Sequence, residues 1–127
     1  MDVRDAVEAD AGRMAELGDA PTDVMRNLVH DRTVRVAERN DEIVGFVSFD
    51  ARERTVHITQ LEGESDACDR LLEEPVTFAQ REGMAVELLA PETDDTMQSA
   101  ASNAGFDRVG PGPRFKGTPT IKYRLDG

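Results

Sequence analysis

The sequence predicts an α/β domain in which helices flank a mixed, mostly antiparallel sheet. Three observations predict this fold class. Apolar residues recur at every second position between residues 33 and 61, which indicates a meander of antiparallel strands. Strand and helix patterns then alternate up to the C-terminus, so the sheet also acquires crossover connections. At 127 residues, of which 39% are hydrophobic, the chain fits one domain that spans residues 1–127.

The N-terminal part is predicted to contain a short strand and two helices. Val3 to Ala6 form the candidate strand, and a helix over residues 9–17 ends at Gly18. Pro21 and Thr22 open the second helix. Its core-facing side is an apolar stripe at helical spacing, made of Val24, Met25, Leu28 and Val29.

The meander that follows is predicted to have three strands, at residues 33–38, 43–49 and 55–61. Turns are expected at residues 39–42 and 52–53, since Asn and Asp tolerate positive φ. On the third strand, period-two alternation places Val56, Ile58 and Gln60 on one face.

A long helix is predicted after the meander. Ser65 or Asp66 can cap its N-terminus, and it extends to about residue 82. Pro75 falls inside this helix, where it removes one backbone donor and should kink or split it. Gly83 closes the helix.

The C-terminal part alternates strand and helix. Residues 84–89 form a nearly continuous apolar strand, interrupted by Glu87, of the kind that is buried on both sides. Thr93 or Asp94 caps a helix up to residue 103. The last two strands are expected at residues 107–109 and 120–125. The predicted order is β-α-α-β-β-β-α-β-α-β-β, which implies a sheet covered on both faces.

The chain is strongly acidic, with 26 Asp and Glu against 15 Lys and Arg and a net charge of −11. The acidic residues are dispersed and only two basic residues are lysine, a composition that resembles proteins adapted to high salt; solubility alone is the alternative explanation. This charge disfavours binding to nucleic acid. Residues 1–5 lack the apolar stretch of a secretory signal, and no apolar run approaches the ~20 residues of a membrane span, so we expect a cytoplasmic protein.

The order of elements resembles that of the GNAT acetyltransferase superfamily, and the likeness covers essentially the whole chain. Four local stretches carry it: VRDA with ADA at 3–11, VAERNDEIVGF at 36–46, LL with AQREG at 71–83, and AGF at 104–106. The resemblance implies a GNAT-like domain that transfers an acetyl group from acetyl-CoA to the amine of a small molecule or a peptide. It also suggests a homodimer, because C-terminal strands often pair between GNAT subunits.

In the resembled family, a loop between the fourth strand and the third helix holds the pyrophosphate of acetyl-CoA on backbone amides and at the helix N-terminus. Counting back from residue 71 places this loop on Gly63, Glu64, Ser65, Asp66, Ala67 and Cys68. The resemblance also assigns His57, Ile58 and Thr59 to the thioester carbonyl and the pantetheine arm. Residues 62–74 contain six acidic side chains and one basic one, and each carboxylate near a pyrophosphate repels it by roughly 1 kcal/mol per close pair.

Acetyl transfer to an amine needs a base that deprotonates an ammonium group. His57 is one candidate because its ordinary pKa lies near neutrality, with an exposed strand histidine as the alternative. Glu87 is the second candidate, as a buried base with a raised pKa, with a strand-end or ion-paired carboxylate as the alternative. The tyrosine that many GNAT members carry in the last helix is replaced by Ala101, and the only tyrosine is Tyr123.

Other reactive side chains are few. Cys68 is read as a small core residue and not as a nucleophile, because acidic neighbours raise a thiol pKa and no histidine lies nearby in the sequence. With a single cysteine, no metal site is predicted. Basic residues concentrate near the C-terminus, where they could hold an anion such as the CoA 3′-phosphate or pair with acidic side chains: Arg108, Arg114, Lys116, Lys122 and Arg124.

Two functions are therefore predicted from the sequence. The first is an acetyl-CoA-dependent N-acyltransferase, which the resemblance implies. The alternative is a GNAT-fold binding or regulatory module that has lost acetyl transfer, which the acidic, glycine-poor loop at residues 63–68 favours.

Overall fold

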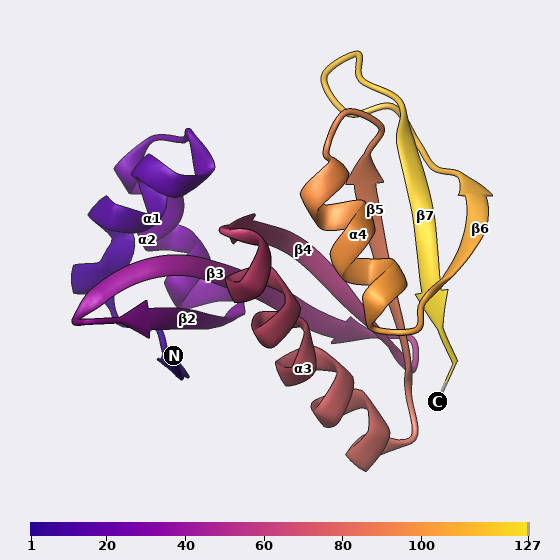
Figure 1. Cartoon of the computed structure of the whole chain (residues 1–127), viewed down its shortest axis with the longest axis horizontal. Coiled ribbons are helices and arrows are strands. Elements are labelled where there is room, and N and C mark those ends of the chain that lie inside the picture. Colours follow the sequence, from indigo (N-terminus) through magenta and orange to yellow (C-terminus); the bar gives the residue numbers. More distant parts are fainter. Residues whose placement is uncertain (127) are drawn as a thin grey trace.

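The computed structural model describes residues 1–126, in which seven strands and four α-helices follow the predicted order (Figure 1). The elements are β1 (Asp2–Asp5), a 3₁₀ turn η1 (Glu8–Asp10), α1 (Ala11–Gly18), α2 (Thr22–Asp31), β2 (Thr33–Arg39), β3 (Glu42–Arg52), β4 (Thr55–Gly63), α3 (Ser65–Glu82), β5 (Ala85–Pro91), α4 (Asp95–Asn103), β6 (Asp107–Pro111) and β7 (Thr120–Leu125). The bounds of β7 are those predicted, and the other boundaries shift by a few residues. None of the helices within residues 1–126 is long and apolar enough to cross a membrane.

The strands form one sheet in the order β1-β2-β3-β4-β5-β7-β6. All neighbours are antiparallel except β4 and β5, which are parallel. The pairing of β4 with β5 extends only from Thr55↔Ala85 to Ile58↔Leu88. Beyond these residues the two strands separate, and their arrowheads point apart in Figure 1. The sheet is thus mixed, mostly antiparallel and open at one place.

Helices cover the two faces of the sheet unevenly. Helices α1 and α2 pack on β2 and β3 around the buried side chains of Met14, Met25 and Phe46. Helices α3 and α4 pack on the opposite face of the sheet. On β5, Leu89 is 39% exposed. The predictions of a strand buried on both sides and of a sheet covered on both faces are therefore wrong for β5, because α1 and α2 cover the other half of the sheet.

Helix α3 is one continuous helix, so the predicted split at Pro75 is wrong. The proline ring is fully buried in the core. Burying its apolar surface offsets the one backbone hydrogen bond that proline removes. The predicted cap is also wrong, since the N-cap residue is Glu64 and neither Ser65 nor Asp66, and the Glu64 side chain makes no capping hydrogen bond.

A β-bulge at Thr59 changes which side chains of β4 face α3. The register between β3 and β4 skips this residue. Val56 and Ile58 belong to the core cluster on the α3 side, and beyond the bulge Leu61 joins them at 3% exposure. The prediction that Gln60 shares this face is wrong, because the extra residue reverses the alternation.

Candidate functional site

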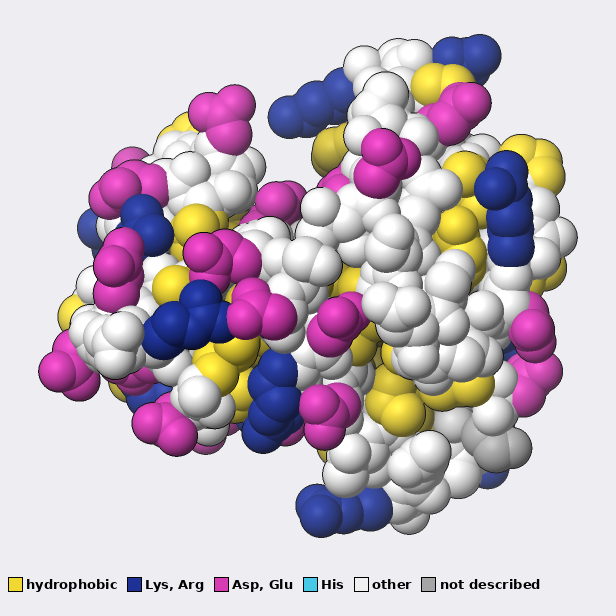
Figure 2. Space-filling model, viewed as in Figure 1, with side chains coloured by type: hydrophobic (Ala, Val, Ile, Leu, Met, Phe, Trp, Pro, Cys, Tyr) yellow, Lys and Arg dark blue, Asp and Glu magenta, His cyan; other side chains and the backbone are white. Residues whose placement is uncertain are grey.

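The opening between β4 and β5 is the candidate site. Beyond residue 58 of β4 and residue 88 of β5, the two strands make no pairs, although β4 continues to Gly63 and β5 to Pro91. Among the described residues, 1–126, one edge of residues 59–63 therefore has no strand partner. Its backbone N–H and C=O groups can pair with an extended ligand that carries amides. The space-filling view shows a notch between the lobe of α1 and α2 and the loop end of β5 and β7 (Figure 2).

Thr59 is the first residue of β4 beyond the pairing with β5. Its Oγ1 lies 2.5 Å from Oγ of the buried Ser48, which fixes the bulge to β3. Three residues were predicted to bind a thioester carbonyl and a pantetheine arm. Of these, His57 and Ile58 lie within the paired segment, and only Thr59 lies at the free edge.

Two glycines bring the N-terminus of α3 to this opening. Gly63 joins β4 to α3 with φ of +129°, and a Cβ there would lie 2.4 Å from the carbonyl oxygen of Val44. At Gly45, a Cβ would lie 2.9 Å from the carbonyl oxygen of Glu62 and 3.1 Å from Cβ of Ala67. Only glycine fits both positions, and so the first turn of α3 packs directly on β3 and β4.

The first turn of α3 offers backbone donors for an anion. The N–H groups of Ser65 and Asp66 have no hydrogen-bond partner among residues 1–126. The N–H of Ala67 donates to Oδ1 of Asp66 at 2.9 Å. A helix N-terminus favours negative charge through its free donors and its dipole. This end of α3 can bind an anion, but the Asp66 carboxylate occupies one of its donors.

An arginine from the β2–β3 hairpin compensates part of the acidity at this helix end. Arg39 donates to Oε2 of Glu64 at 2.6 Å and also to the carboxylate of Asp66. The hydrogen bond to Glu64 and the charge of Asp66 raise the pKa of Arg39. These three side chains are 37%, 57% and 62% exposed, so their contacts can exchange with other partners at little cost. Arg39 was not predicted as part of the site, because it lies 25 positions before Glu64 in the sequence and reaches the loop only in the folded chain.

Glu62 is a further residue that the sequence analysis did not single out. It lies beyond the bulge and pairs with Phe46 of the α1–α2 cluster, so it is on the face opposite α3. Burial, followed by the charge of Asp94, raises the pKa of Glu62. Asp94 lies just after β5 and caps α4, accepting from the N–H of Met97 at 3.0 Å. Within residues 1–126 the Glu62 carboxylate has no ion-pair partner, which suits a proton acceptor.

The two predicted bases, His57 and Glu87, lie opposite each other in the paired part of β4 and β5. Arg124 pairs with the Glu87 carboxylate, and Nζ of Lys122 lies 4.0 Å from it. To act as a base, Glu87 would have to give up these cations. His57 is partly exposed and precedes the opening by two residues of β4.

The basic residues near the C-terminus divide into two groups. Arg124 and Lys122 pair with Glu87, and Nε of Arg124 also lies 2.7 Å from Oδ1 of Asp126. The remaining three have no carboxylate within 4.0 Å in the described part of the chain, and they lie on β6 and the loop after it: Arg108, Arg114 and Lys116. The predicted pairing with acidic side chains is thus confirmed for two residues.

Cys68 is a core residue, as predicted, with 1% exposure. Burial and the nearby carboxylates raise the pKa of its thiol to about 12, so it is protonated at neutral pH and unsuited to nucleophilic attack. The Tyr123 hydroxyl donates to Oε1 of Gln98 at 3.3 Å inside the core. Among residues 1–126, no group of three or more His, Cys, Asp or Glu side chains could hold a metal ion.

Solved structures place this arrangement in a known fold. No protein-family model and no curated protein sequence matches the chain. It superposes on the ribosomal-protein-alanine N-acetyltransferase of Brucella melitensis with a TM-score of 0.81, 15% identity and 99% of each chain covered. For Ard1 of Thermoplasma volcanium the TM-score is 0.84 at 12% identity, covering 98% of this chain and 96% of Ard1. For yncA of Salmonella typhimurium, solved with its cofactor acetyl-CoA, the TM-score is 0.78 at 18% identity. This superposition covers 99% of this chain and 93% of yncA. The chain has the GNAT acetyltransferase fold.

Proposed function

We propose that this chain with the GNAT acetyltransferase fold is an acetyl-CoA-dependent N-acyltransferase that acts on the amine of a small molecule or a peptide. The opening between β4 and β5, with the N-terminus of α3 beside it, is the observation that carries the proposal. It combines a free strand edge with an anion-binding helix end. A thioester of CoA has both an amide-bearing arm and a pyrophosphate, so it matches these two features.

The backbone of the site fits acetyl-CoA, which supplies an activated acetyl thioester when bound. The free edge of residues 59–63 would hold the pantetheine arm, and the N–H groups of residues 65–67 would hold the pyrophosphate. The carboxylates of Glu64 and Asp66 oppose an anion at this position. Arg39 forms hydrogen bonds with both carboxylates in this structure, and it is the cation that would instead pair with the phosphates.

Glu62 is the base that the geometry favours. It borders the opening, and a carboxylate with a raised pKa takes a proton from an ammonium group more readily than an ordinary one. Removal of that proton would free the nitrogen lone pair of the acceptor. His57 and Glu87 stay as the bases predicted from the sequence. Because Tyr123 is engaged with Gln98, water or the protonated base would give a proton to the leaving thiolate, which becomes the CoA thiol.

Binding of acetyl-CoA is the first test of this proposal. We expect calorimetric titration to detect it, with a dissociation constant of about 1 mM or lower, more strongly in molar KCl than at low salt because salt screens the carboxylates. No heat at millimolar acetyl-CoA in either condition would overturn the enzyme proposal. Where binding is found, release of the CoA thiol with a panel of amines then measures transfer.

A set of three matched variants identifies the base. Glu62→Gln, Glu87→Gln and His57→Gln each remove one titrating group at similar size. If Glu62 is the base, E62Q lowers kcat about a hundredfold and leaves acetyl-CoA affinity unchanged, while the other two variants retain activity. Full activity of E62Q across the pH range would contradict this assignment, and the variant that lost activity would then mark the base.

The acidic loop favours a second candidate function, a binding or regulatory module without acetyl transfer. Glu64 and Asp66 lie where an anion would bind, and Asp66 already occupies the Ala67 N–H. Binding of acetyl-CoA without thiol release for any amine would favour this module. We further propose that the protein works in a cytoplasm of high salt, as its dispersed charge of −11 suggests, and as a homodimer, which light scattering would test.

A further inference from the structure

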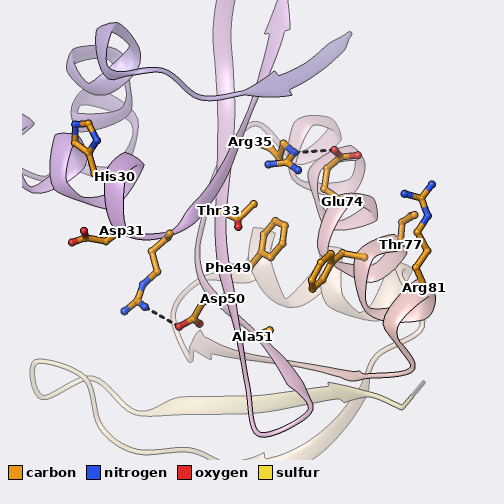
Figure 3. A pocket seen from close by; sticks show the side chains of 12 residues that line it. His30, Asp31, Thr33, Arg35, Phe49, Asp50, Ala51, Glu74, Thr77 and Arg81 are labelled. Carbon is orange, nitrogen blue, oxygen red and sulfur yellow. Dashed lines mark hydrogen bonds and ion pairs between the residues drawn. The ribbon is translucent and has the colours of Figure 1, made fainter.

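A pocket of about 600 Å³ lies on the α3 side of the sheet, towards the other end of α3 from the opening (Figure 3). It is formed by the end of α2, the start of β2, the end of β3 and residues 74–81 of α3. None of its lining residues belongs to the candidate acetyl-CoA site. Its volume is in the range of pockets that hold small molecules, about 300–1,000 Å³.

Two phenylalanines give the pocket an apolar wall. Phe49 of β3 is buried at 3% exposure, whereas Phe78 of α3 is 39% exposed. Their ring centroids lie 6.1 Å apart at an interplanar angle of 47°. The partly exposed ring of Phe78 leaves apolar surface in water that a ligand with an apolar body would cover.

Three arginines also line the pocket, and one of them, Arg81, has no carboxylate partner in the described part of the chain. Nη1 of Arg32 lies 2.8 Å from Oδ2 of Asp50, and Nε of Arg35 lies 3.5 Å from Oε1 of Glu74; Figure 3 marks both contacts. Arg81 has no carboxylate within 4.0 Å in residues 1–126. The chain has 26 acidic and 15 basic residues, so most arginines can find a carboxylate. The guanidinium of Arg81 is therefore available to bind an anion.

On α3 this arginine lies one helical turn from Phe78, and both residues line the pocket. Arg81 follows Thr77 by four positions and Phe78 by three, so all three side chains lie on neighbouring parts of one helix face. A guanidinium and a hydroxyl next to an aromatic ring match a carboxylate on an apolar body. The carboxylates of Asp50 and Glu74 in the same pocket would repel a doubly charged phosphate more than a single carboxylate.

We propose that this pocket binds a small monocarboxylate with an apolar body. The body lies against Phe78 and Phe49, and the carboxylate is bound by Arg81 and the hydroxyl of Thr77. This site is separate from the opening between β4 and β5, and the inference does not depend on the proposed acetyl transfer.

Titration of the whole chain with phenylacetate, followed by backbone amide NMR shifts, tests the proposal without acetyl-CoA. Phenylacetamide lacks the charge and acetate lacks the apolar body, so we expect phenylacetate to bind at least about tenfold more tightly than either. Saturable shifts are expected at Thr33, Thr77 and Phe78, which line the pocket.

Three variants locate the binding. Arg81→Gln and Phe78→Ala should each weaken phenylacetate about tenfold. Arg108→Gln is the matched control, because Arg108 also has no carboxylate within 4.0 Å in residues 1–126 but lies on β6. R108Q should bind as the wild type does. If F78A fails to fold, Thr77→Val takes its place with the same expected direction.

The proposal is overturned by any of three results. These are equal binding of phenylacetamide and phenylacetate, shifts that map outside the pocket, or unchanged affinity in R81Q. Because the readout uses no acetyl-CoA, failure here leaves the proposed transferase untouched, and failure of acetyl-CoA binding leaves this pocket untouched.

Discussion

Replacing Asp66 by alanine is expected to tighten acetyl-CoA binding about tenfold at low salt, because it removes a negative charge beside the proposed pyrophosphate position. In the structure, one oxygen of this carboxylate accepts from the N–H of Ala67 at 2.9 Å, and the other is bonded to Arg39. The substitution returns one backbone donor and part of one guanidinium to the N-terminus of α3. It also removes a negative charge from the position where the pyrophosphate is proposed to bind.

The magnitude follows from Coulomb's law. Two unit charges about 4 Å apart in water-like surroundings interact by about 1 kcal/mol, and Asp66 is exposed enough for that dielectric to apply. A pyrophosphate carries two charges, so removal of one carboxylate gains about 1–2 kcal/mol, which corresponds to about tenfold in the dissociation constant. In molar salt the Debye length shrinks to about 3 Å, and the gain should fall to about twofold.

Asp23→Ala is the matched control for this experiment. Asp23 is the second residue of α2, as Asp66 is the second residue of α3, and it pairs with Arg26 at 2.7 Å. Each variant changes the net charge from −11 to −10, one negative charge fewer. Calorimetry of both variants at low salt and in molar KCl separates local from global charge effects. The reasoning is refuted if D66A binds acetyl-CoA no more tightly than D23A, or if its gain is the same at both salt concentrations.

Three further predictions concern the stability of the fold and the reactivity of its buried side chains. In urea denaturation, Gly45→Ala should destabilise the protein by about 1–3 kcal/mol, because its Cβ would press on a backbone carbonyl of β4. Gly12→Ala in α1 is the control: its Cβ meets nothing within 4 Å, so it should stabilise the protein by about 0.4–1 kcal/mol. Equal effects of the two substitutions would contradict the close approach at Gly45. Cys68 should react with a thiol reagent at pH 8 only after unfolding, since burial raises its pKa to about 12, and fast labelling of the native chain would disprove it. The hydrogen bond from Arg4 lowers the pKa of Asp10, although burial acts in the opposite direction. Ionised Asp10 therefore stabilises the fold, fully so above its ordinary pKa of 3.8. This stabilisation is lost as the pH falls through the lower pKa of the folded state. Asp10→Asn should therefore be less stable than the wild type at neutral pH, with a difference that shrinks in acid; a constant difference would show that the pair does not titrate as described.

Local patterns in the sequence were sufficient for the identity and order of the elements. Period-two alternation marked β2, β3 and β4, and apolar positions at helical spacing or capping residues marked the helices. Residues 120–125 were predicted with the observed bounds of β7. The bulge at Thr59 was missed because the sequence around it has no glycine or other local signal, and the register shift exists only in the pairing with β3. Pro75 was misjudged for a similar reason, since the surrounding core, and not the local sequence, keeps α3 continuous.

The candidate site was predicted only in part. The run of residues 63–68 does form the end of β4 and the first turn of α3, as the resemblance implied. Glu62 was counted as one more acidic residue, because its burial and its nearness to Asp94 arise only when β4 and α4 lie across the opening. A sequence pattern gives no sign that Asp94 will influence a carboxylate as distant in the chain as Glu62.

The charges of the site are arranged by tertiary contacts, and this alters the argument against catalysis that the acidic loop first suggested. Arg39 comes from a different hairpin and shares its charge with Glu64 and Asp66, so these three residues together carry −1 and not −2. Glu62 and Asp94 have no such cation within 4.0 Å in the described residues, and their charge borders the opening. A cationic amine would be attracted to the opening, while the anionic end of a cofactor would lie beside the arginine. Acidity therefore disfavours an anion at the loop less than a count along the sequence suggests, and it favours the acceptor that the proposed reaction requires.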